Sequence, residues 1–100
     1  MNVDEELSEA VVMVIGFRTR NYPRLDYTVL AQRFGVSRAP GMASRVEAIL
    51  DELGRVEVDW SKHSLASGGD DARSFMAGRH PELSEEALAA LDWKFTFDWR

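Results

Sequence analysis

The sequence predicts a helix-dominated α+β domain, for three reasons. Apolar residues recur at helical spacing in three segments of the N-terminal half and in one segment near the C-terminus. Residues 55–60 and 93–99 instead alternate apolar with polar side chains, which is typical of half-buried strands. With 100 residues, 45% of them apolar, the chain can form one hydrophobic core of ordinary size. We therefore expect a single domain, residues 1–100, with four helices and one small antiparallel ribbon.

The first helix is expected at about residues 4–18. Asp4 can cap its first turn, and the acidic residues that follow favour the positive end of the helix dipole. Leu7 and Val11 lie near one face, as in an amphipathic helix. A buried strand over residues 11–17 is the alternative, because this stretch is rich in β-branched residues. Length and charge placement favour the helix.

The second and third helices are expected at about residues 26–34 and 43–53. Asp26 can cap the second helix, and Gly35 stands where a helix often ends in a left-handed residue. The third has the clearest apolar stripe of the chain. Because a Pro-Gly pair interrupts residues 36–42, we expect an irregular connection there.

A fourth helix is expected at about residues 84–92, with Ser84 as its N-cap. Residues 61–79 are rich in serine and glycine and predict a loop-rich connection. Within this connection, Gly68–Asp71 is expected to be either a mobile loop or a binding loop, and its role stays open.

The C-terminal residues allow two interpretations. Residues 93–99 alternate four aromatic side chains with polar ones, and as a strand they could pair with residues 55–60 in the ribbon. The alternative is an all-α fold in which residues 84–99 are helical. Aromatic side chains would then point to most sides of that helix, which requires burial all round. We favour the strand.

The charged residues are unevenly distributed along the chain, whose formal net charge is -5. Residues 1–17 carry four carboxylates and no base, residues 18–45 carry six arginines and one aspartate, and residues 46–60 carry five carboxylates and one arginine. An acidic total argues against nucleic-acid binding only if the charge is evenly spread. What matters is whether folding places the acidic segments on the arginines or leaves the arginines free.

Residues 30–37, Leu-Ala-Gln-Arg-Phe-Gly-Val-Ser, resemble the first helix and turn of a helix-turn-helix DNA-binding domain. The resemblance implies that Ala31 lets two helices cross closely and that Gly35 makes the turn. It also implies that Val36 fills the core and that Ser37 caps the recognition helix. The match covers about ten of the 100 residues.

The sequence departs from the helix-turn-helix pattern after the turn. Gly41 and Ser44 stand where that family has apolar core residues, and Pro40 beside Gly41 is expected to break the recognition helix. The third helix would be the recognition helix behind a lengthened turn. Its exposed face carries Glu47 and Asp51, whose carboxylates would repel phosphate.

Two functions of different class follow. We favour a small regulatory protein-interaction module, of the kind found among antitoxins, immunity proteins and phage accessory factors. The alternative is a helix-turn-helix-like regulator whose arginines contact phosphates. Arginine suits both, and tryptophan and arginine are the usual anchors of protein interfaces. The candidate binding residues are Arg18, Arg20, Arg24, Arg33, Arg38, Arg45 and Trp99.

Other functions lack their sequence signals. The chain has no cysteine, its two histidines lie 17 residues apart in loop-like sequence, and it contains no phosphate-binding glycine motif. We therefore expect no enzyme activity, no catalytic residue, no cofactor and no metal. No apolar run approaches the ~20 residues of a membrane span, and the acidic N-terminus argues against a signal peptide. We expect a cytoplasmic protein without a membrane partner, and the oligomeric state stays open.

Overall fold

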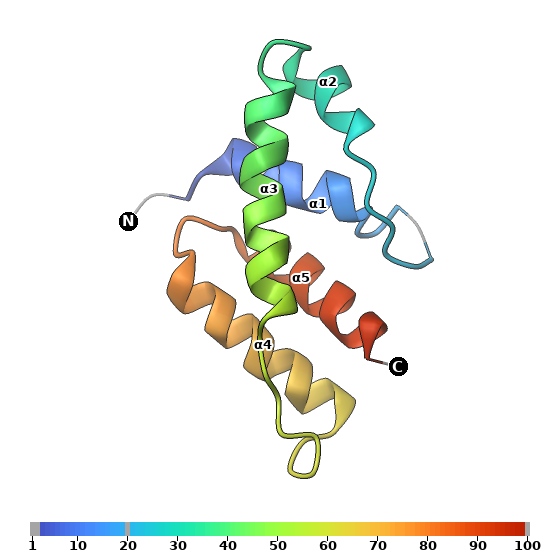
Figure 1. Cartoon of the computed structure of the whole chain (residues 1–100), viewed down its shortest axis with the longest axis vertical. Helices are drawn as coiled ribbons and strands as arrows, with labels where there is room; N and C mark the ends of the chain where they lie inside the picture. Colours follow the sequence, from blue (N-terminus) through green and yellow to red (C-terminus); the bar gives the residue numbers. More distant parts are fainter. Residues whose placement is uncertain (1–2, 20, 100) are drawn as a thin grey trace.

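The computed structural model describes residues 3–19 and 21–99, and all regular secondary structure in them is helical (Figure 1). Helix α3 runs along the long axis of the molecule, α1 and α5 pack against it, and α4 lies beside α5. The Cα radius of gyration is 13.4 Å, close to the value of about 13 Å expected for this length. The helices are α1 (Glu5–Ile15), α2 (Thr28–Phe34), α3 (Ala39–Gly54), α4 (Leu65–Arg79) and α5 (Glu85–Asp98).

The predicted antiparallel ribbon is wrong, because the described residues contain no strand. Residues 93–98 continue α5, and residues 55–60 are an irregular segment. The all-α alternative fits. Side chains two residues apart lie about 200° apart on a helix, whereas side chains four residues apart share a face. The alternation therefore places aromatic pairs on two opposite faces of α5.

Both aromatic faces of α5 contact other aromatic rings of the chain. On one face, the ring centroids of Trp93 and Phe17 lie 5.6 Å apart. On the other, the Phe95 ring stacks on Trp60 at 6.2 Å and lies 6.3 Å from Trp99. Contacts on both sides of α5 thus bury Phe95 and half-bury Trp93, whereas Trp99 stays 54% exposed.

Helix α4 replaces most of the predicted loop-rich connection over residues 61–79. Ser64 and Ser67 form a reciprocal capping box at its first turn. Gly68 and Gly69 are buried and let α4 approach its neighbours, since a Cβ at Gly68 would lie only 2.5 Å from the Trp60 ring. The glycines that suggested a loop are therefore close-packing positions in a helix.

Helix α3 begins earlier than predicted, at Ala39 rather than near residue 43. Pro40 lies in the first turn, where its missing N–H has no intrahelical acceptor to lose. Gly35 ends α2 with a φ of +89°, as the sequence indicated. The connection between α2 and α3 is therefore shorter than residues 36–42.

All five helices contribute buried side chains to one core, and the predicted caps Asp4 and Ser84 help to position α1 and α5. The backbone N–H of Leu7 donates to Asp4 Oδ1 at 3.0 Å, and that of Ala87 donates to Ser84 Oγ at 3.1 Å. The predicted cap of α2 is displaced: its N-cap is Tyr27, and Asp26, one residue earlier, accepts at Oδ1 from the N–H of Thr28 at 3.0 Å. The largest fully buried side chains are Leu7, Val11, Val14, Ile15, Leu30, Val46, Met76 and Leu91.

Candidate functional site

Three of the predicted binding arginines are held by carboxylates of the first acidic segment. Arg38 forms two hydrogen bonds to Glu6, the shorter at 2.7 Å, and Arg45 lies 3.0 Å from Asp4. Arg33 is paired with Glu9. Folding thus places the first acidic segment against three of the six arginines and pairs their charges. We call this group of six residues the arginine side.

The pairing lowers the pKa of two of these carboxyl groups, those of Glu6 and Asp4. The Arg38 guanidinium holds the pKa of Glu6 below its ordinary value, and the Leu7 N–H, followed by Arg45, does the same for Asp4. A hollow of about 360 Å³ between α1 and the start of α5 is also acidic, but Arg33 already lines it. The arginine side therefore offers few unpaired charges of either sign.

Of the three remaining predicted arginines, the structure describes Arg18 and Arg24. Arg18 lies 4.0 Å from Glu86 and over the Phe17 ring. Arg24 has no ion-pair partner within residues 3–19 and 21–99, and Arg20 lies outside the described residues. The structure thus groups Arg33, Arg38 and Arg45 against the first acidic segment, and Arg18 pairs elsewhere, with Glu86.

The turn between α2 and α3 differs from the helix-turn-helix expectation in two respects. Ser37 does not cap the next helix, because the N-cap of α3 is Arg38 and no side-chain cap hydrogen bond forms there. Val36, which the resemblance places in the core, is 82% exposed. Phe34 is buried instead, with the guanidinium groups of Arg33 and Arg38 over its ring at 4.8 and 5.5 Å. The apolar residue of the turn therefore does not perform the packing role that the resemblance assigns to it.

A different surface is open, around Trp99. Four adjoining hollows, which we call the furrow, run from Leu25 past Leu50 and Trp99 to Phe75. Their volumes are about 610, 260, 520 and 610 Å³ in that order, and each shares lining residues with the next. Hollows of this size accept several side chains of a partner.

Apolar side chains form the floor of the furrow and part of its rim. Phe95 is 3% exposed and Trp60 is half-buried beneath Trp99, whose ring lies 5.4 Å from that of Trp60. Trp99 itself is 54% exposed, and Phe75 is 48% exposed at the far end. The furrow therefore presents supported but uncovered aromatic surface.

Carboxylates surround this apolar surface in excess over cations. Two of the five pair with the two cations of the furrow, Asp51 with Arg55 and Asp98 with Lys94. The other three, Glu47, Glu57 and Asp71, form no ion pair within the described residues. Burial first, and the Glu47 charge second, raise the pKa of Tyr27, which also lines the furrow.

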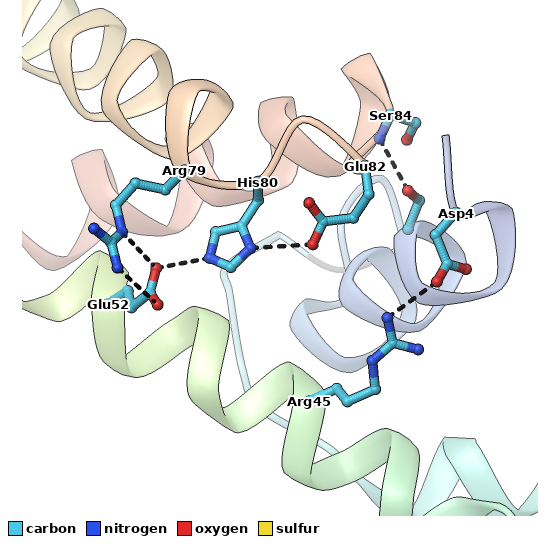
Figure 2. Close-up of polar contacts among 8 residues, drawn as sticks. Asp4, Arg45, Glu52, Arg79, His80, Glu82 and Ser84 are labelled. Atoms are coloured by element: carbon cyan, nitrogen blue, oxygen red, sulfur yellow. Dashed lines mark hydrogen bonds and ion pairs between the residues drawn. The ribbon is translucent and has the colours of Figure 1, made fainter. Parts of the chain in front are cut away.

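A third group of charged residues joins α3 to the connection between α4 and α5 (Figure 2). Glu52 Oε2 lies 3.1 Å from Arg79 Nε and 2.6 Å from His80 Nε2, and His80 Nδ1 lies 3.2 Å from Glu82. Arg79 first, and His80 second, lower the pKa of Glu52. The acidic and basic groups satisfy one another, so this cluster acts as a structural joint.

The same joint extends to the start of α1. The N–H of Ser84 donates to the buried Ser8 hydroxyl at 2.9 Å, and the N–H of Asp4 donates to the Glu82 carbonyl at 2.7 Å.

Within residues 3–19 and 21–99, no group of three or more His, Asp or Glu side chains could hold a metal ion. In that same part of the chain, every helix is too short or too polar to cross a membrane.

The sequence identified Trp99 as a candidate but missed most of the furrow. Glu57 and Asp71 belong to segments that were assigned to a strand and a loop, and Leu25 and Phe75 carried no periodic signal. The charge imbalance at the furrow depends on which carboxylates form ion pairs with cationic side chains, and only the tertiary structure decides that. The alternation of aromatic residues was the one signal that pointed to this surface.

Comparison with known proteins gives no further guide. No protein family, curated protein or solved structure gave a significant match to this chain. The functional argument therefore depends on the geometry of the furrow and of the arginine side.

Proposed function

We propose that this chain is a small protein-interaction module that binds a partner protein at the furrow, with Trp99 as its main anchor. The observation that carries the proposal is an uncovered tryptophan over an apolar hollow, beside Glu57, which forms no ion pair within the described residues. The partner segment that suits this surface has apolar side chains flanked by basic ones. The role is regulatory and depends on binding, without catalysis.

The support for Trp99 is energetic as well as geometric. Its ring packs against Phe95 and Trp60 in the free chain. Binding therefore costs little additional side-chain entropy at Trp99. Tryptophan is among the residues that most often dominate interface energies. The cytoplasm is part of the same proposal, and the lack of cysteine supports it, because small secreted domains are commonly disulfide-linked.

The proposal is tested by placing a photo-crosslinking residue at Ser44 or Ser74, which line opposite ends of the furrow, and at Val36 as the control. We expect both furrow positions, and not Val36, to crosslink one protein in the native cell. That protein, once purified, should bind the Trp99→Ala variant about 30-fold more weakly than the native chain. Tyr22→Ala is the matched variant, because Tyr22 is 51% exposed and does not line the furrow.

Crosslinks confined to Val36, or equal affinity of the purified partner for the native chain and Trp99→Ala, would contradict the proposal. If circular dichroism shows that Trp99→Ala has lost its helices, Trp99→Leu takes its place, because leucine keeps an apolar side chain on the Phe95 ring. The proposal then requires that Trp99→Leu is folded and still binds the partner more weakly than the native chain.

Nucleic-acid binding through the arginine side is the second candidate, and one observation favours it. Helix α3 starts at Ala39, directly after a four-residue connection, and the exposed face of its N-terminal half carries Ser44 and Arg45 with no carboxylate on the helix before Glu47. Affinity for duplex DNA should then fall steeply with salt, with a slope set by the phosphates contacted. Absence of duplex binding at low salt would eliminate this candidate.

A further inference from the structure

We propose that the occupant of the furrow is an amphipathic helix of the partner, with an apolar centre and a basic residue toward each end. This inference rests on the proposed function and specifies the chemistry of the partner. It follows from three properties of the furrow: where its unpaired carboxylates lie, where its apolar surface lies, and which backbone groups line it.

The unpaired carboxylates lie at the two ends of the furrow. Glu47 lies at one end, in the hollow shared with Leu25 and Tyr27. Asp71 lies at the other, in the hollow that contains Phe75, and Glu57 lines both that hollow and the neighbouring one with Trp99. Arg55 also lines these two hollows, and its charge is paired with Asp51. A ligand that spans the furrow therefore meets negative charge at each end, and cationic side chains there would gain most from the contact.

The apolar surface lies between these ends. The central hollow is lined by Leu50, Leu53, Phe95 and Trp99, and its two charged residues, Lys94 and Asp98, are paired with each other. Apolar side chains of a ligand would bury this surface without leaving a charge uncompensated. The order along the furrow is thus acidic, apolar and acidic.

The walls of the furrow favour a helical ligand over an extended one. Along residues 44–54 the wall is α3, whose interior backbone groups are already hydrogen-bonded within the helix. The described residues contain no strand edge to which an extended peptide could add. A helix satisfies its own backbone groups, and residues 44–54 give it about 15 Å of wall, or three turns.

Charge also separates this occupant from the obvious competitors. A second copy of the chain carries the same net charge of -5 and the same unpaired carboxylates at its furrow. Nucleic acid and anionic membranes bring further negative charge to Glu47, Glu57 and Asp71. Each of these would be repelled from the furrow, whereas a basic helix is attracted to it.

The test uses the full chain and three synthetic peptides of about 14 residues, or four helical turns. The first places leucine at helical spacing with lysine toward the ends, the second replaces lysine with glutamate, and the third keeps the first composition in alternating order. Isothermal titration calorimetry at low and high salt measures their affinities. We expect only the first peptide to bind, with affinity that falls as salt rises.

Two matched pairs of substitutions locate the binding. Glu47→Gln with Glu57→Gln should weaken the lysine peptide about threefold to tenfold, since exposed charge pairs are individually weak. Glu5→Gln with Glu86→Gln removes the same charge outside the furrow and should change affinity less than twofold. Trp99→Ala should weaken the same peptide about 30-fold.

Equal binding of the lysine and glutamate peptides, or equal weakening by the two double variants, would overturn the inference. So would a dimer in sedimentation that Trp99→Ala dissociates, or furrow-dependent binding of duplex DNA or of vesicles with anionic lipid. If the crosslinked partner binds at the furrow through a neutral, acidic or non-helical segment, the helix inference fails while the proposed function stands. If neither the partner nor any peptide needs Trp99, both fail.

Discussion

The arginine side and the furrow differ in how folding treats their charges. On the arginine side, Glu6 and Asp4 of the N-terminal segment meet Arg38 and Arg45, so a segment that looks strongly cationic in the sequence becomes a set of surface ion pairs. Around the furrow, carboxylates outnumber cations and Trp99 remains uncovered. Charge runs in a sequence therefore indicate a binding surface only after their tertiary partners are known.

The largest expected effect of any substitution comes from the furrow floor. Phe95→Ala removes a buried ring that contacts Trp60 and Trp99, and we expect a loss of about 3–5 kcal/mol in the free energy of unfolding, because the cavity cannot fully close. Urea unfolding measures it. A loss below about 1 kcal/mol would mean that the furrow has no packed floor and would remove the contrast with the arginine side.

The close packing behind the furrow gives the second largest effect. Gly68→Ala should destabilise the fold by about 1–3 kcal/mol, since the added methyl group meets the Trp60 ring that supports Trp99. Gly78→Ala on the same helix is the matched control, because no atom lies within 4 Å of its Cβ position. That change should stabilise by about 0.5–1 kcal/mol through helix propensity. Equal effects of the two would show that α4 does not press against Trp60.

Trp99 should contribute much less to stability than to binding. Trp99→Ala exposes part of two rings and should cost about 1 kcal/mol in unfolding free energy, the scale of an aromatic pair at a surface. Thermal unfolding provides the measurement. A cost as large as that of Phe95→Ala would place Trp99 in the core and weaken its role as an anchor.

Substitutions on the arginine side should have the smallest effect on stability, and that effect should depend most strongly on salt and pH. Arg38→Gln removes an exposed pair, so its effect on the melting temperature should be smaller than that of Trp99→Ala and should vanish at 1 M salt. The pKa of Glu6 and of Asp4 is lowered in the folded chain. Their stabilising effect is therefore complete above the unfolded pKa of about 4 and is lost as pH falls through the lowered values.

Melting temperatures of the native chain and Arg38→Gln from pH 7 to pH 2 test this linkage. The two curves should converge as the carboxylates become protonated. A difference that persists at pH 2, or one that is unaffected by salt, would show that Arg38 acts through packing on the Phe34 ring instead.

Much of the helical framework could be predicted from local sequence. Asp4 and Ser84 act as caps because their side chains reach backbone groups three residues ahead, and Gly35 ends α2 because it adopts a positive φ. These are short-range effects. Helix periodicity located the middle of α1 and α3 for the same reason.

The failures concern residues whose role depends on distant segments. Residues 93–98 have a strand-like alternation that is equally an i, i+4 pattern on two faces, and only packing against Phe17 and Trp60 decides between them. Gly68 and Gly69 suggested a loop because a sequence does not reveal the neighbour that a small residue accommodates. The furrow was missed for the same reason, since Leu25, Trp99 and Phe75 line one continuous surface only after folding.

The most direct test of the central claim is to map the binding of the lysine–leucine peptide by two-dimensional NMR of the ¹⁵N-labelled chain. The account predicts that amide shifts cluster in residues 44–60, 71–75 and 94–99, and that they disappear when the peptide carries glutamate in place of lysine. Shifts centred on residues 33–45, or an unchanged spectrum at saturating peptide, would contradict it.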